Sequence, residues 1–83
     1  MPRVSDLKRA LTRAGESLRL FTLGQKGVTQ KDGLAGIARM RALCERINDG
    51  VASGEYARDA AHAVVSARGQ ILAAEARLAL LRK

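Results

Sequence analysis

The sequence predicts an all-α domain in which a shorter N-terminal helix packs on a hairpin whose last helix is long. Three segments carry apolar residues at steps of three or four positions, which is the spacing of one face of a helix. The chain has one proline in 83 residues, and glycine-containing segments separate the three periodic ones. These features predict a single domain over residues 1–83, arranged as a three-helix bundle or helical hairpin.

The first predicted helix covers about residues 6–23, with Ser5 or Asp6 as its N-cap. Its apolar residues draw a narrow core-facing stripe, formed by Leu7, Leu11, Ala14, Leu18 and Phe21. Leu20 and Leu23 fall on the polar side, so we expect either a second cover there or an earlier end of the helix. Basic residues occupy the other side, namely Lys8, Arg9, Arg13 and Arg19.

The second predicted helix covers about residues 30–48. Thr29 and Asp32 match the pattern of a capping box, in which a hydroxyl and a carboxylate accept hydrogen bonds from free amides at a helix start. The run Asn-Asp-Gly at 48–50 is typical of a helix end. One face of this helix is apolar or glycine: Gly33, Gly36, Ile37, Met40, Leu43, Cys44 and Ile47.

Two glycines on that face, Gly33 and Gly36, lower helix propensity and allow another backbone to approach closely. In an antiparallel hairpin they would lie opposite residues 67–70 of the last helix, with Ala67 as the facing residue.

The third predicted helix covers about residues 55–82 and contains a single glycine. One apolar seam consists of Ala60, Val64, Ala67, Ile71, Ala74, Leu78 and Leu81. A second consists of Ala61, Val65, Leu72, Ala76 and Ala79. A bundle helix needs an apolar face only about 100° wide. This helix therefore carries more apolar surface than the chain can cover, and we expect the second seam to contact a partner chain.

Arg68 and Glu75 project between the two seams. They would meet the same residues of a second copy that runs antiparallel, and such polar residues can define the register of an assembly. The alternative is that they are ordinary charges at the boundary of a seam.

Fifteen Lys and Arg residues against eight Asp and Glu residues give the chain a net charge of +7. This balance favours contact with nucleic acid, anionic lipid or an acidic protein, although it can also serve solubility alone. Phe21 and Tyr56 are the only aromatic residues, too few for a platform that stacks bases. With one cysteine and no apolar run of about 18 residues, the sequence predicts a cytoplasmic chain without a transmembrane segment.

Catalytic and metal-binding patterns are sparse. His62, the only histidine, lies on a polar helical side, and Cys44 lies among apolar residues, where a thiol acts as a small hydrophobe. The acidic residues are dispersed, and residues 24–28 lack the spacing of a phosphate-binding loop. We therefore expect no enzymatic activity, cofactor or metal.

Two functional hypotheses follow. The first is a small non-enzymatic helical protein-binding module, such as an accessory, adaptor or inhibitor protein, with a homo-oligomer or another protein as its partner. Its expected interface comprises Leu20, Leu23, Ala61, Val65, Arg68, Leu72, Glu75, Ala76 and Ala79. The alternative is a basic nucleic-acid-binding regulator that contacts phosphates, or an acidic surface, through Lys8, Arg9, Arg13 and Arg19.

Overall fold

The computed structural model describes residues 3–82, which form three α-helices and one short 3-10 helix. Helix α1 is Val4–Thr22, α2 is Gln30–Ala52, the 3-10 helix η1 is Arg58–Ala60 and α3 is Ala61–Leu81. Because η1 leads directly into α3, the two form the longest helical stretch, of 24 residues. The predicted all-α class is confirmed.

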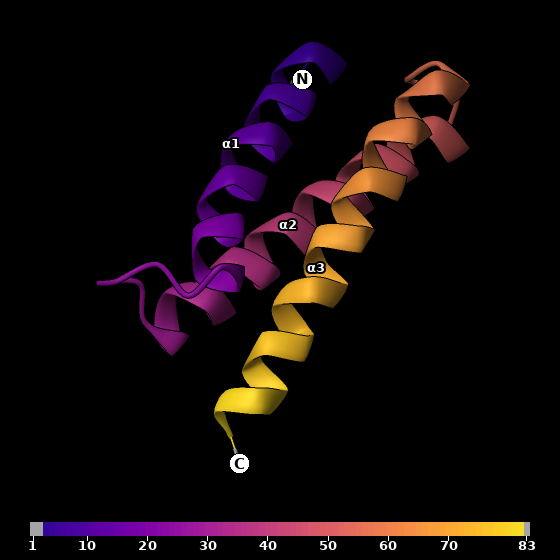
Figure 1. Cartoon of the computed structure of the whole chain (residues 1–83). Coiled ribbons are helices and arrows are strands. Elements are labelled where there is room, and N and C mark those ends of the chain that lie inside the picture. The colour runs from indigo at the N-terminus through magenta and orange to yellow at the C-terminus, as the bar shows by residue number, and fades with distance from the viewer. Residues whose placement is uncertain (1–2, 83) are drawn as a thin grey trace.

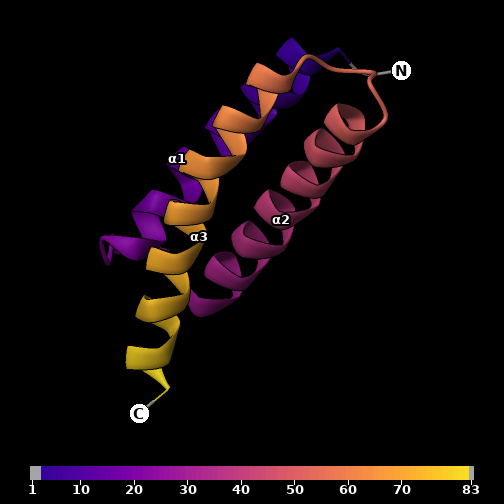
Figure 2. The same ribbon diagram turned by 90° about the vertical axis from the view of Figure 1, so that its right-hand side faces the viewer.

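The three helices form an up-down-up bundle in which every pair of helices is in contact. Helices α2 and α3 form an antiparallel hairpin, and α1 crosses it, running in the same general direction as α3 (Figure 1). A view from the side shows that the last turns of α3 extend past the ends of the other two helices (Figure 2). The bundle is elongated, with extents of 43 × 19 × 15 Å.

The core lies between the helices along the stripes that the periodicity predicts. All five stripe residues of α1 are buried, and so is the first seam of the last helix except Leu81. Leu18, Met40 and Ile47 are the largest fully buried side chains. Among the described residues, no polar or charged side chain is buried, so apolar contact holds the helices together.

Helix α1 begins and ends one or two residues before the predicted bounds. Neither Ser5 nor Asp6 caps it: the Arg3 carbonyl accepts hydrogen bonds from the amides of Asp6 and Leu7. The added residues bring Val4 into contact with the core, a gain that the local capping pattern does not reveal. At the other end Leu23 is the C-cap, and Gly24 follows with a φ of 73°.

The boundary between α2 and α3 differs most from the prediction. Residues 48–50 do not end α2, which continues to Ala52, and the last helix begins at Arg58 rather than near Glu55. Gly50 is buried within the helix because the ring of Tyr56 lies against it, and a Cβ built at this position would overlap the ring. The Gly50 carbonyl also accepts a hydrogen bond from the Tyr56 amide at 2.9 Å. Here glycine provides space for packing and is not a stop signal.

The predicted neighbour of Gly33 and Gly36 is wrong, because both face α1 and not α3. A Cβ at Gly33 would lie 2.7 Å from ring atoms of Phe21, and one at Gly36 would lie 3.0 Å from Leu18 Cδ1. The close approach expected for these glycines is therefore present, but between α1 and α2. A sequence pattern identifies the face of a helix, and the crossing of three helices decides which neighbour meets that face.

The predicted capping box of α2 is confirmed. The Asp32 amide donates to Thr29 Oγ1 at 3.2 Å, and the Thr29 amide donates to Asp32 Oδ2 at 2.9 Å. The hydrogen bond from the Thr29 amide, followed by that from its side chain, holds the pKa of the Asp32 carboxyl below its usual range.

Candidate functional site

The second seam of the last helix is an apolar surface that the bundle leaves largely uncovered, and we call it the α3 stripe. It consists of Ala61, Val65, Leu72, Ala76 and Ala79. Its two largest side chains, Val65 and Leu72, are 71% and 67% exposed. The core-facing seam of the same helix is buried from Ala60 to Leu78. Helix α3 is therefore apolar on two faces, and the chain covers one of them.

A groove of about 330 Å³ lies between α2 and α3 beside the stripe, and we call it the α2–α3 groove. Its lining is Arg41, Cys44, Glu45, Asn48, Arg68, Ile71, Leu72 and Glu75. Arg41 Nη2 donates to Glu75 Oε2 at 2.8 Å, which ties the two walls together. Arg68 and Glu75 thus lie on the flank of the stripe that faces α2.

The thiol of Cys44 is buried where the groove meets the core. Burial raises its pKa, while the charge of Arg68 acts weakly in the opposite direction. A raised pKa lowers the fraction of reactive thiolate that Cys44 carries at neutral pH.

The charges of the α2–α3 groove are balanced, unlike those of the whole chain. Two arginines, Arg41 and Arg68, line it together with two glutamates, Glu45 and Glu75. The chain as a whole carries +7. The groove and the adjoining stripe are therefore an electrically neutral part of a basic protein.

Leu20 and Leu23 do not join the α3 stripe. Leu20 lines a separate groove between α1 and α2, near Val28. Leu23 is 68% exposed and lines a shallow hollow with Gly69 and Ala73, on the side of α3 that faces α1. The structure thus brings the seven predicted interface residues of the last helix together along one side, and places the two leucines of the first helix elsewhere.

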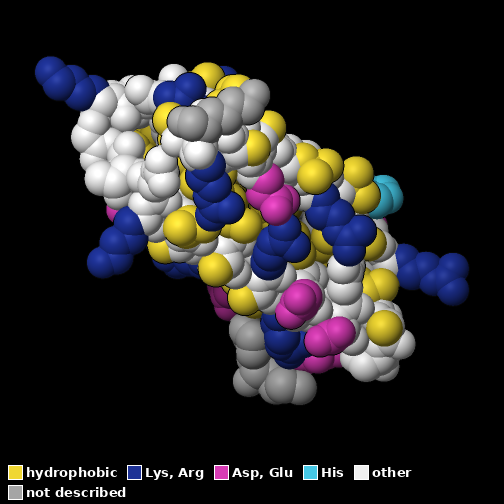
Figure 3. Space-filling view, turned by 90° about the horizontal axis from the view of Figure 1, so that it is seen from below, with side chains coloured by type: hydrophobic (Ala, Val, Ile, Leu, Met, Phe, Trp, Pro, Cys, Tyr) yellow, Lys and Arg dark blue, Asp and Glu magenta, His cyan; other side chains and the backbone are white. Residues whose placement is uncertain are grey.

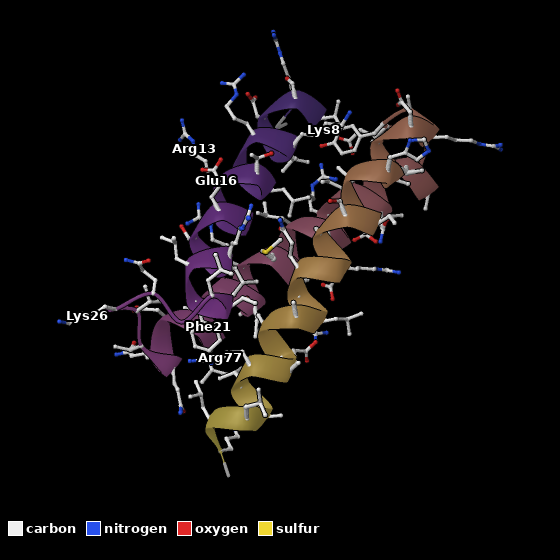
Figure 4. The ribbon with its side chains drawn as sticks, in the orientation of Figure 1. Lys8, Arg13, Glu16, Phe21, Lys26 and Arg77 are labelled. Atoms are coloured by element: carbon white, nitrogen blue, oxygen red, sulfur yellow. The ribbon has the colours of Figure 1, made fainter. Side chains whose placement is uncertain are left out.

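The four basic residues predicted to contact phosphates are spread around α1. Lys8 and Arg19 line the groove between α1 and α3, whereas Arg13 lines the groove between α1 and α2. Figure 4 shows Lys8 on the side of α1 nearest α3 and Arg13 on the opposite side. At the end of the bundle toward which α3 runs, acidic and apolar side chains lie between the basic ones (Figure 3).

His62 lines a groove of about 660 Å³ between α1 and α3, together with Asp59 and Ser66. These three residue types can form a catalytic triad when hydrogen bonds of about 2.6–3.2 Å connect them. No hydrogen bond joins any two of them in the described part of the chain. Within residues 3–82, His, Cys, Asp and Glu side chains also form no cluster that could hold a metal ion.

One basic residue that the sequence reading did not single out, Arg77, contacts the turn after α1. A Cβ at Gly24 would lie 3.0 Å from Arg77 Nη2, and the side chain is half-buried in the region of Phe21 (Figure 4). A positive charge close to the C-terminal end of α1 is favoured by the helix dipole. This contact could not be predicted from the sequence, because it depends on how far α1 and α3 are shifted along each other in the bundle.

None of the helices in the described part of the chain is both long enough and apolar enough to span a bilayer. No protein-family model, curated protein or solved structure matches this chain.

Proposed function

We propose that this protein is a small non-enzymatic protein-binding module that docks on its partner through the α3 stripe. The observation that carries the proposal is the exposure of Val65 and Leu72 on a helix whose other apolar face is already buried in the core. Exposed apolar surface of this kind, when it forms a continuous strip, is typical of a protein interaction site.

The shape of the surface supports this proposal. Apart from Val65 and Leu72, the members of the stripe are alanines, so a second helix can lie close to the surface of α3. The adjoining α2–α3 groove adds Arg68 and Glu75 as polar groups at the edge of the apolar strip. Interfaces commonly combine an apolar centre with a polar rim. An accessory, adaptor or inhibitor protein would act through such a surface without chemistry of its own.

The nucleic-acid alternative has less support from the geometry. Lys8, Arg13 and Arg19 are divided between two grooves, and no aromatic side chain accompanies them there. A phosphate backbone would meet only part of the set at one time.

A paired substitution tests the proposal. Replacing Val65 and Leu72 together by Glu places two charges on the stripe, and helicity should be retained because both side chains are exposed. The matched control replaces Leu20 and Leu23 by Glu, which are exposed on α1 and its C-cap. Each protein is tagged, isolated under native conditions from the cells that produce it, and analysed by cross-linking and sedimentation.

We expect the wild type and the Leu20/Leu23 variant to form the same protein complex, and the Val65/Leu72 variant to lose it. Retention of the complex by the Val65/Leu72 variant would refute docking through the stripe. In parallel, binding to duplex DNA and to RNA is measured against salt concentration. Tight binding that depends on Lys8, Arg9, Arg13 and Arg19 and weakens steeply with salt would favour the nucleic-acid alternative.

A further inference from the structure

We propose that the occupant of the α3 stripe is a second copy of this chain, running antiparallel and related by a two-fold axis that passes beside Leu72. This inference rests on the proposed function, because it names the partner of the same surface. It follows from the spacing of the stripe, from the two charges on its flank and from the neutrality of the α2–α3 groove.

Two members of the stripe, Val65 and Ala79, are placed symmetrically about Leu72. Val65 precedes it by seven residues and Ala79 follows it by seven, and this seven-residue repeat is the one that keeps two packed helices in contact. In an antiparallel pair centred on Leu72, each Val65 meets the partner subunit's Ala79, and the two Leu72 side chains meet at the axis. A larger residue thus packs against a smaller one on both sides of the centre, which is the pattern that interdigitating side chains require.

The flank of the stripe carries one positive and one negative residue, so it can pair with the same flank of a second copy. Arg68 and Glu75 lie on the same flank, toward α2, on either side of Leu72. In an antiparallel pair this flank faces the same flank of the other copy. With the axis beside Leu72, each Arg68 is level with the partner subunit's Ala76. The partner subunit's Glu75 is one residue away, about 1.5 Å along the helix, so two identical ion pairs form. In a parallel pair the two α2-facing flanks would instead lie on opposite sides of the interface, so Arg68 and Glu75 could not pair with each other across it.

Arg68 and Glu75 can both take part in an ion pair with a second copy. No ion pair joins Arg68 to a carboxylate in the described part of the chain. Glu75 accepts the hydrogen bond from Arg41 through Oε2. A carboxylate accepts through both of its oxygens, so Oε1 can receive the guanidinium of the second copy. Glu75 would then lie between two arginines, one from each chain.

The balance of charge favours a copy of this chain over an acidic partner. Arg41, Glu45, Arg68 and Glu75 cancel one another in the α2–α3 groove, while the chain carries +7. A strongly acidic protein would be attracted to other surfaces of the chain rather than to this one. Two neutral faces can meet without the repulsion that two basic faces would produce. Because α2 borders the stripe, the assembly would be a four-helix bundle built from two hairpins, with α1 on the outside.

Charge reversal with rescue in trans tests this arrangement. In Arg68→Glu, both symmetric contacts become Glu against Glu, and in Glu75→Arg both become Arg against Arg. We expect each variant alone to be monomeric, with a dissociation constant raised by about 100-fold or more, because like charges are apposed twice. An equimolar mixture of the two should form a heterodimer, since one chain then carries two glutamates and the other two arginines at the facing positions.

The readout is the mass by sedimentation velocity at micromolar concentration, with circular dichroism to show that each variant is folded. Two controls accompany it. Arg39→Glu reverses a charge that lines the α1–α2 groove, and should leave the dimer intact. Arg41→Ala removes the contact within the chain that Glu75→Arg also breaks, and should not dissociate the dimer.

Three results would overturn the inference: a monomeric wild type, a folded Arg68→Glu variant that stays dimeric, or a mixture of the two variants that stays monomeric. A monomeric wild type that still loses its protein complex through the Val65/Leu72 substitutions would leave the proposed function standing and remove only the second copy as partner.

Discussion

Replacing Gly50 by Ala should destabilise the protein, although alanine is the better helix former. Gly50 lies inside α2, so the substitution gains up to about 1 kcal/mol of helix propensity. The new Cβ would overlap the ring of Tyr56, a buried residue of the loop between α2 and η1. Overpacking of this kind costs about 1–3 kcal/mol, and the ring has little room to move because Arg46 lies over it at 5.3 Å.

Because the built Cβ overlaps the ring, the cost should lie in the upper part of that range, about 2–3 kcal/mol. The net effect should then be a loss of about 1–2 kcal/mol of unfolding free energy, or roughly 4–16 °C in Tm for a domain of this size. Thermal and urea unfolding followed by circular dichroism measure it, at one fixed protein concentration. Gly69→Ala is the matched control: it makes the same change in the middle of α3, where nothing lies within 4 Å of the added Cβ. This control should gain stability, up to about 1 kcal/mol.

A variant without the Tyr56 ring tests whether the ring causes the loss of stability. In Tyr56→Ala, the contact is absent, and adding Gly50→Ala should then stabilise the helix instead of weakening it. If Gly50→Ala alone were as stable as the wild type, the ring would not be held against α2, and Gly50 would after all be only a helix-ending residue.

Three further outcomes are expected. Gly36→Leu should cost about 1–3 kcal/mol by forcing Leu18 aside; a rise in Tm would show that this face of α2 is open. The pKa of Asp32 is depressed in the folded state, so its stabilising effect is present above the unfolded pKa and is lost as pH falls through the folded value. The difference in Tm between wild type and Asp32→Asn should therefore shrink in acid melts, and a constant difference would contradict this. Cys44 is buried with a raised pKa, and a maleimide should modify it slowly until the protein unfolds; rapid labelling would place it on the surface.

What the sequence determined by itself is the class of the fold and the inward face of each helix. The apolar stripe of α1, from Leu7 to Phe21, is buried as its spacing predicts. The same holds for the first seam of the last helix, from Ala60 to Leu78. Both features are local: a helix repeats every 3.6 residues or so, and an apolar stripe on it has to be covered. The capping box of Thr29 and Asp32 is local as well, since its partners are three residues apart.

The tertiary structure alone decided which helix meets which face and what each glycine does. The residues around Gly50 predict a helix end there, yet this glycine lies within α2 and provides space for the ring of Tyr56. Gly33 faces Phe21 of α1 rather than α3. Periodicity gives the direction of a side chain but not the identity of its neighbour.

The same distinction holds for the α3 stripe and its charges. Its apolar character could be predicted from the spacing of Val65 and Leu72, because helix α3 has more apolar faces than a small bundle covers. The pairing of Glu75 with Arg41 could not be predicted. It depends on the register between two antiparallel helices, and that register results from the packing of all three helices around one core.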